Sequence, residues 1–155
     1  FAANKLGTTF STTDTTCRSS TTRVRHGRGK LQLGLLRVGP DGTALSQIYK
    51  LSSDPGGTVI GAFAQGPSTV TDVGFDVSRE HLRIERIDGE WVARGLGSTN
   101  GSILYRRGES ARVIEMPAKI SSPETVHTSV PIQAGDELML GRSTRFLVMG
   151  IDFED

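Results

Sequence analysis

The chain has 155 residues, a length that suits one domain with a tail and excludes a multidomain enzyme. Its 18 basic and 17 acidic residues nearly balance, and no apolar run approaches the roughly 20 residues of a spanning helix, which argues against a membrane protein. Nineteen glycines favour tight turns and short strands over long helices, and a single cysteine, Cys17, excludes a scaffold of internal disulfides. Because the chain starts with Phe1 and not with Met, we expect it to be a fragment or a processed form.

Residues 1–30 differ in kind from the rest of the chain. They carry six basic residues against one acidic residue, and between Gly7 and Thr22 eleven of sixteen positions are Thr or Ser. So few apolar side chains cannot form a packed core, and we therefore predict a flexible arm or linker over residues 1–30. Threonine also favours strands, so an open alternative is that part of the arm adds to the edge of a sheet.

From Leu31 onwards the apolar residues alternate with a period of two, as in a half-buried strand, and we place the start of the globular domain there. Turn signals separate the later candidates, and Asp88-Gly89 is the clearest hairpin signal. The candidate strands are Leu31–Leu35, Gln47–Leu51, Thr58–Phe63, Leu82–Ile87, Trp91–Gly95, Glu137–Leu140 and Arg145–Met149. Short strands without a helical period predict an antiparallel sandwich or barrel over residues 31–150, with a tail at residues 151–155.

The interval from Glu115 to Val130 fits neither a strand nor a helix pattern. It contains Pro117 and Ser121-Ser122-Pro123-Glu124, and Pro131 follows it directly. We predict a long loop or a short helical turn there.

Three short motifs follow one another along the predicted domain: Val59-Ile60-Gly61, Val77-Ser78-Arg79-Glu80-His81-Leu82 and Gly97-Ser98-Thr99-Asn100-Gly101-Ser102. Each motif is weak alone, but their ordered occurrence is specific. Together with residues 131–141 they closely resemble the forkhead-associated (FHA) domain family, and the resemblance covers about Leu31 to Met149. It implies an all-β, FHA/SMAD-like antiparallel β-sandwich of about eleven short strands, with loops at one end that bind phosphothreonine peptides.

The resemblance implies a phosphopeptide site made of Ser78, Arg79, Thr99 and Asn100. The chemistry of these residues agrees with that role, because hydroxyl groups and a guanidinium supply charge-assisted hydrogen bonds to a phosphate dianion. The Asn100 amide both donates and accepts, so it can bind a peptide main chain.

Three further residues are implied to be structural. Gly61 ends the first motif, His81 fastens its loop through the ring nitrogens, and Gly101 permits a tight turn. Taken singly, four of the motif residues have simpler explanations: Ser78 ends a turn before a strand, Arg79 is a solvated surface charge, and Asn100-Gly101 is a common hairpin dipeptide. Their order along the chain favours the binding site.

One position departs from the family pattern. The family has an Arg that reaches the phosphate directly after the Gly61 position, and this chain has Ala62 there. A charge-assisted hydrogen bond contributes about 1.5–3 kcal/mol, so its loss weakens binding by about 10- to 150-fold. Two alternatives stay open: Arg79 compensates as a bidentate phosphate ligand, or this is a degenerate FHA module that binds its partner without phosphate.

Asp76 stands two residues before Ser78, in a loop that in similar domains reads the peptide beyond the phosphothreonine. In that role it would favour a basic residue in the ligand by charge complementarity. The alternative is that Asp76 only initiates a turn.

The arm is a candidate for phosphorylation by a Ser/Thr kinase. A phosphorylated arm would dock into the loops of its own domain, because effective concentrations within one chain reach the millimolar range. The alternative, a plain linker between domains, is the preferred role. The candidate threonines, which lie beside Asp14, are Thr12, Thr13, Thr15 and Thr16.

The end of the arm is also a candidate for nucleic-acid contact. Its basic side chains suit backbone phosphates, but no aromatic stacking platform accompanies them, so a soluble linker is again preferred. These side chains are Arg23, Arg25, His26, Arg28 and Lys30.

Catalysis and cofactors are not expected. Ser78 and His81 lie three residues apart at the entrance of a strand, without the elbow, distant base and oxyanion pocket of a catalytic serine. Three histidines and one cysteine show no metal-ligand spacing, and Gly27-Arg28-Gly29-Lys30 lacks the context of a nucleotide phosphate loop. We therefore expect a cytoplasmic, non-catalytic adaptor without membrane contact, whose partner is a phosphothreonine protein such as a kinase substrate.

Overall fold

The computed structural model describes residues 2–3, 6–7, 32–119 and 129–151. The chain divides into two compact units, residues 1–31 and residues 32–155. In the first unit, β1 (Ala2–Ala3) pairs antiparallel with β2 (Leu6–Gly7). The candidate phosphorylation sites and the basic cluster of the arm lie outside the described residues, so the division into arm and domain stays a prediction.

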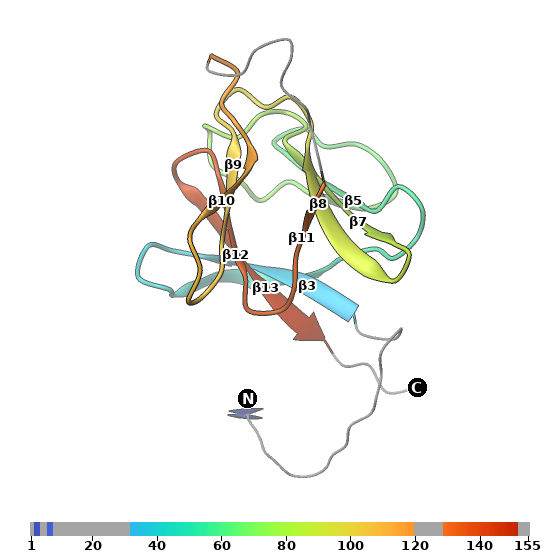
Figure 1. The fold of residues 1–155 in the computed structure, drawn as a ribbon, viewed down its shortest axis with the longest axis vertical. Helices are drawn as coiled ribbons and strands as arrows, with labels where there is room; N and C mark the ends of the chain where they lie inside the picture. The colour runs from blue at the N-terminus through green and yellow to red at the C-terminus, as the bar shows by residue number, and fades with distance from the viewer. Residues whose placement is uncertain (1, 4–5, 8–31, 120–128, 152–155) are drawn as a thin grey trace. The chain divides into compact units, whose positions relative to one another are not determined.

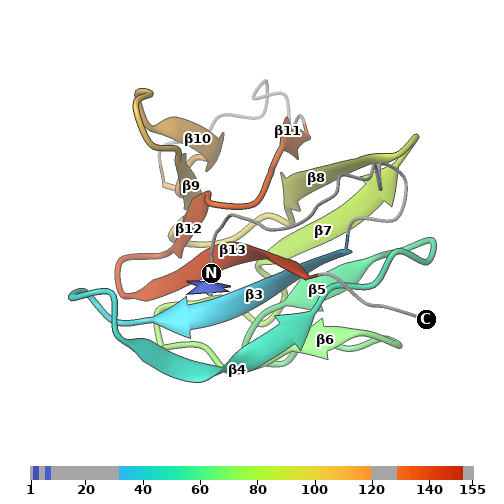
Figure 2. The same ribbon diagram turned by 90° about the horizontal axis from the view of Figure 1, so that it is seen from below.

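Among the described residues of the second unit, all regular secondary structure is β-strand, and these strands form two sheets. They are β3 (Gln32–Val38), β4 (Ala44–Lys50), β5 (Thr58–Ile60), β6 (Thr69–Val70), β7 (Leu82–Ile87), β8 (Glu90–Gly95), β9 (Ser102–Tyr105), β10 (Arg112–Glu115), β11 (Val130–Pro131), β12 (Glu137–Leu140) and β13 (Thr144–Ile151). One sheet has six strands in the order β10-β9-β12-β13-β3-β4, and the other has five in the order β11-β8-β7-β5-β6 (Figure 1 and Figure 2). The predicted all-β sandwich of about eleven short strands is confirmed.

The core lies between the two sheets because apolar side chains alternate along the central strands. Leu33 and Leu35 of β3 are buried, as are Phe146 and Val148 of the neighbouring β13. These strands pair antiparallel, with Leu35 opposite Val148, and they run side by side in Figure 2. Ile84 of β7 adds to the same buried cluster from the five-stranded sheet. This period of two is what a sheet with one buried face requires.

The turn predicted at Asp88-Gly89 is present between β7 and β8. Asp88 has a φ of 53° and Gly89 a φ of 81°, and Ile87 pairs with Glu90 across the turn. Positive φ at both central residues is the geometry of a two-residue hairpin whose twist matches its strands. The sequence interpretation of this hairpin is therefore confirmed.

The predicted strand over Thr58–Phe63 is too long, since β5 ends at Ile60. The backbone amide of Gly61 still donates to Val70, at 3.0 Å, but that of Ala62 turns to the carbonyl oxygen of Ser78, also at 3.0 Å. The backbone amide of Phe63 donates to Arg79 at 3.0 Å in the same way. The chain therefore leaves the sheet at Gly61 to bind a loop.

In the second unit, four of the described strands were not predicted: β6, β9, β10 and β11, which have two to four residues each. β11 contains Pro131 and lies at the edge of its sheet, where a residue without an amide hydrogen is tolerated. Between β10 and β11 the described residues 116–119 and 129 contain no helix, and residues 120–128 lie outside the described part. In the described chain, no helix has the length and apolar character needed to span a bilayer.

Candidate functional site

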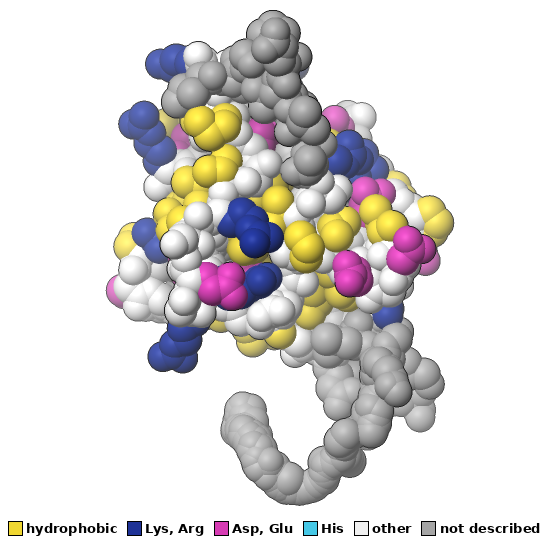
Figure 3. Space-filling model, in the orientation of Figure 1, with side chains coloured by type: hydrophobic (Ala, Val, Ile, Leu, Met, Phe, Trp, Pro, Cys, Tyr) yellow, Lys and Arg dark blue, Asp and Glu magenta, His cyan; other side chains and the backbone are white. Residues whose placement is uncertain are grey.

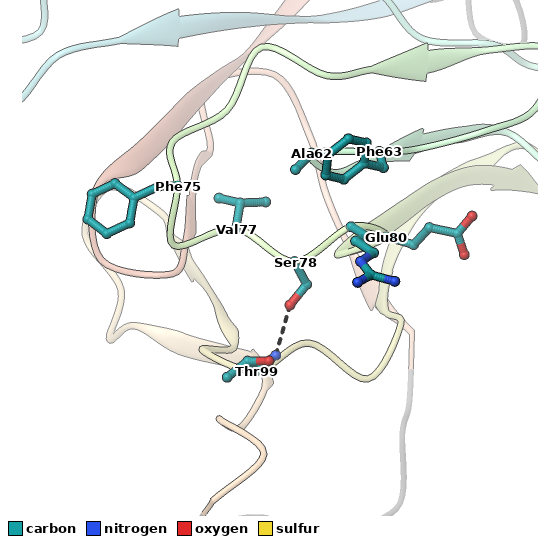
Figure 4. A pocket seen from close by; sticks show the side chains of 8 residues that line it. Ala62, Phe63, Phe75, Val77, Ser78, Glu80 and Thr99 are labelled. Atoms are coloured by element: carbon teal, nitrogen blue, oxygen red, sulfur yellow. Dashed lines mark hydrogen bonds between the residues drawn. The ribbon is translucent and has the colours of Figure 1, made fainter.

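Three loops, which carry residues of the three sequence motifs, meet at one end of the sandwich. They follow β5 (residues 61–68), β6 (residues 71–81) and β8 (residues 96–101). Ala62 joins the first loop to Ser78 of the second through its backbone amide. The hydroxyl oxygen of Ser78 accepts a hydrogen bond from the backbone amide of Thr99 in the third loop, at 3.0 Å (Figure 4). The loop that carries Ser78 and the loop that carries Thr99 are therefore neighbours.

Ser78, Arg79 and Thr99 line one open recess, together with Ala62. The Ser78 hydroxyl accepts from Thr99 and so keeps its own hydrogen available to donate. The exposed Arg79 side chain makes no ion pair with any residue that the structure describes. The recess therefore presents two hydroxyl groups and a guanidinium, all donors to an anion.

Asn100 lies beside the recess and connects two of the loops. Its side-chain amide nitrogen donates to the backbone carbonyl of Asp76 at 2.8 Å. One amide hydrogen and the amide oxygen stay available, so Asn100 can still donate to and accept from a peptide main chain. The structure thus brings all four predicted binding residues to the same end of the sandwich.

His81 is fully buried between the second and third loops. Its Nδ1 accepts from the backbone amide of Ser78 at 3.0 Å, and its Nε2 lies 2.8 Å from the carbonyl oxygen of Gly101. Since Nδ1 accepts and a carbonyl cannot donate, the ring proton is on Nε2, which donates to Gly101. Both ring nitrogens are therefore used to fasten the two loops together.

Gly61 and Gly101 are positions where no other residue fits. A Cβ at Gly61 would collide with the backbone carbonyl of Arg79. Gly101 has a φ of 80°, and a Cβ there would lie 2.6 Å from the carbonyl oxygen of Glu115. Both glycines thus permit close approach of backbones, and Gly101 also permits the left-handed turn beside Asn100.

Glu115, which the sequence analysis did not identify as a site residue, fixes the third loop through hydrogen bonds from its buried carboxylate. Its side chain is only 5% exposed, and it accepts from the backbone amides of Gly97 and Ser98 at 2.7 and 2.9 Å. It also accepts from the Ser98 hydroxyl at 2.7 Å, and that hydroxyl accepts from the Gly101 amide at 3.0 Å. The sequence carries no local signal for this role, because Glu115 ends a short strand that was not itself predicted.

The sequence profile of the FHA domain matches residues 59–141. The chain belongs to the FHA domain family. An FHA domain-containing protein of Arabidopsis thaliana is 33% identical over 129 residues, which cover 81% of this chain and 28% of that protein. The chain thus spans less than a third of the length of this curated relative.

Solved FHA domains share the fold. The solution structure of an FHA domain from an Arabidopsis thaliana hypothetical protein matches with a TM-score of 0.54 at 25% identity, covering 86% of this chain and 98% of that one. An FHA domain solved in a study of phosphothreonine-dependent FHA interactions matches with a TM-score of 0.50 at 21% identity, covering 79% of this chain and 99% of that one. The resemblance inferred from the three motifs is confirmed.

In this FHA domain the Asp76 carboxylate contacts the turn between β12 and β13. It accepts from the backbone amide of Arg142 at 2.7 Å and from the Ser143 hydroxyl at 2.8 Å. Burial alone would raise the pKa of Asp76, but these hydrogen bonds outweigh it and hold the pKa below its ordinary value. A role for Asp76 in reading a ligand stays a prediction, and its visible contacts are with its own domain.

The burial of His81 predicts a pH dependence of stability. Burial lowers the pKa of His81 below its ordinary value of 6.5, outweighing the Gly101 hydrogen bond and the Glu115 and Asp76 charges that raise it. The unfolded chain therefore takes up a proton at a higher pH than the folded domain does. We expect stability to be complete above pH 6.5 and to fall from there down to the folded pKa, by at most about 1.4 kcal/mol per pH unit.

Urea unfolding at a series of pH values between about 5 and 7.5 measures this loss. The matched control replaces the two other histidines of the chain, His26 and His127, with Gln. The control variant should keep the same pH dependence. A stability that stays constant as the pH falls through this window would contradict the assignment to His81.

Charge on the rest of the FHA domain is mixed. On the face shown in Figure 3, basic and acidic side chains are interspersed among hydrophobic ones. Among the described residues, no group of three or more His, Cys, Asp or Glu side chains is arranged to hold a metal ion. This face therefore offers no continuous positive surface of the kind that follows a nucleic-acid backbone.

Proposed function

We propose that this FHA domain is a non-catalytic protein-interaction module that binds a phosphothreonine peptide through Ser78, Arg79, Thr99 and Asn100. The observation that carries the proposal is the recess in which two hydroxyl groups and an exposed guanidinium lie together on short loops. Short loops held by buried hydrogen bonds present these donors in a fixed arrangement, which limits the entropy lost on binding. FHA domains are in general interaction modules and not enzymes.

Each residue has a distinct part in the proposed complex. Arg79 supplies the positive charge and can bind two phosphate oxygens at once. Ser78 and Thr99 donate from their hydroxyl groups, and Asn100 orients the peptide main chain. The FHA domain that shares this fold at 21% identity comes from work on phosphothreonine-dependent interactions, so phosphothreonine is the first ligand to test.

A second candidate function is binding that does not depend on phosphate. Ala62 favours it, because this position lines the recess but supplies no charge. Among the described residues that line the recess, Arg79 is then the one cation that can bind the phosphate. Glu80 lines the same recess and its carboxylate repels the phosphate. If that single cation is insufficient, the same loops bind an unmodified peptide.

The two candidates are separated by titrating matched peptides that carry either phosphothreonine or threonine at one position. We expect the phosphorylated peptide to bind more tightly, and Ser78→Ala to lower its affinity by about tenfold, the contribution of one charge-assisted hydrogen bond. Isothermal titration calorimetry measures both constants.

Ser53→Ala is the matched control, because Ser53 is an exposed serine in the loop that follows β4 and does not line this recess. It should leave the affinity unchanged. Equal binding of the two peptides would refute phosphate dependence and favour the second candidate.

A further inference from the structure

Two phenylalanines stand out among the exposed apolar side chains of the described residues. Phe63 is 68% exposed and Phe75 is 100% exposed. The other large exposed apolar side chains, Leu45, Ile48, Ile87, Tyr105 and Val113, all lie on strands and are less exposed. Of these large, exposed apolar side chains in the described part of the chain, only the two phenylalanines lie in loops.

Both rings belong to the recess that contains the proposed phosphate donors. Phe63 and Phe75 line it together with Ser78 and Thr99. Figure 4 shows Phe75 on one side of the contact between Ser78 and Thr99, and Phe63 beside Ala62 on the other side. A single exposed apolar residue is ordinary on a protein surface. Two rings on opposite sides of one polar contact are a more specific arrangement.

The backbone around Phe75 is held in place on both sides. The amide of Gly74 donates to the hydroxyl of the buried Thr144 at 2.8 Å. On the other side, the carboxylate of Asp76 binds Arg142 and Ser143, and the side chain of Val77 is buried. The loop is therefore anchored at the residues before and after Phe75, while the ring itself is left in solvent.

Phe63 is anchored in the same manner. Its backbone amide donates to Arg79, and the amide of Ala64 closes a turn by donating to Gly61 at 3.3 Å. Phe75 contributes no buried surface to the domain and Phe63 stays mostly exposed, so the exposed part of each ring adds nothing to the stability of the fold. An aromatic side chain has few rotatable bonds, so on an anchored backbone it loses little entropy when a partner covers it, which makes it an effective binding anchor.

We infer that the ligand is a phosphothreonine peptide with bulky apolar side chains on both sides of the phosphorylated residue, which pack against Phe63 and Phe75. This inference rests on the proposed function, because the phosphate places the peptide between the two rings. Glu80 lines the same recess, so acidic side chains next to the phosphothreonine are disfavoured by charge repulsion.

The test uses three phosphothreonine peptides whose neighbouring residues on both sides are Leu, Ser or Asp, each with an unphosphorylated counterpart. The full chain is titrated by fluorescence anisotropy. We expect the Leu-flanked phosphopeptide to bind about tenfold more tightly than the Ser-flanked one, and the Asp-flanked one to bind most weakly. The double variant Phe63→Ser, Phe75→Ser should bind the Leu- and Ser-flanked phosphopeptides equally.

Leu45→Ser is the control, because Leu45 is 56% exposed on β4 and does not line the recess. It should retain the preference for Leu. Equal affinity of the parent chain for the Leu- and Ser-flanked phosphopeptides overturns the inference and leaves the proposed function standing. If no peptide gains affinity from its phosphate, the proposed function fails and the inference fails with it.

Sedimentation of the chain without peptide tests a second copy as the alternative occupant. We expect a monomer at every concentration used for the titrations. A dimer that the double phenylalanine variant abolishes, without any preference for Leu-flanked peptides, overturns the inference by showing that the rings contact another copy of the chain.

Discussion

Glu115→Ala is expected to lower the free energy of unfolding by about 3 kcal/mol and to abolish measurable phosphopeptide binding. The buried carboxylate accepts from the amides of Gly97 and Ser98 and from the Ser98 hydroxyl. The variant removes the acceptor of all three donors and leaves them in a site that water enters poorly. Thr99 and Asn100 follow directly in the chain, so their loop loses its support.

Urea unfolding measures the stability, and calorimetry with the phosphothreonine peptide measures the binding. Glu90→Ala is the matched control, since Glu90 is exposed at the start of β8. It should change neither quantity. Glu115→Gln keeps the shape but turns an amide group toward amide donors, so we expect an intermediate loss of stability. If Glu115→Ala unfolds at the same urea concentration as Glu90→Ala, the assigned role is wrong.

Ala62→Arg is expected to raise the affinity for a phosphothreonine peptide by about 10- to 150-fold, the contribution of one charge-assisted hydrogen bond. Ala62 lines the recess with Ser78 and Thr99, and its backbone is already fixed by the hydrogen bond to Ser78. A guanidinium at this position restores the residue that the family pattern carries. The unphosphorylated peptide should gain nothing, because it offers the new charge no dianion.

Ala64→Arg controls for a general effect of charge. Ala64 lies in the same turn as Ala62 but does not line the recess. Ala64→Arg and Ala62→Arg give the chain the same net charge, so the two variants differ only in where the guanidinium is placed. It should raise the affinity only slightly, and the gain should disappear with added salt. Equal gains for both variants would show that long-range attraction, and not a local phosphate contact, was added.

The Ala62 side chain takes no part in the hydrogen bonds that hold the loops, because Ala62 contributes only its backbone amide, which every residue except proline carries. His81 joins Ser78 to Gly101, and Ser98 joins Gly101 to Glu115. These contacts are internal to the domain and form without a ligand. The departure at Ala62 therefore changes the charge of the recess without removing the contacts that shape it, and the two properties can be tested separately.

Much of the fold follows from local patterns in the sequence. The predicted bounds of β7 and β12 match the structure. In β7, Leu82 and Ile84 alternate with charged residues before the Asp88-Gly89 turn, and in β12 an apolar run follows the turn signal Ala134-Gly135-Asp136. The hairpin at Asp88-Gly89 is equally local, since only a few residue types adopt its backbone angles. The strands that escaped prediction have two to four residues, too few for a period of two to appear.

The sequence by itself determined the all-β architecture, the family and the two site loops that carry Ser78 and Thr99. It could do so because alternation of apolar and polar residues, turn residues and spaced motifs are properties of short segments. Only the tertiary structure decided which side chains support or flank that site. Glu115 reaches Ser98 across 17 positions, and Asp76 reaches Ser143 across 67. Phe75 is exposed because Thr144 and the β12–β13 turn anchor its loop. Such contacts depend on which strands pair and how the two sheets pack, and no local pattern contains that information.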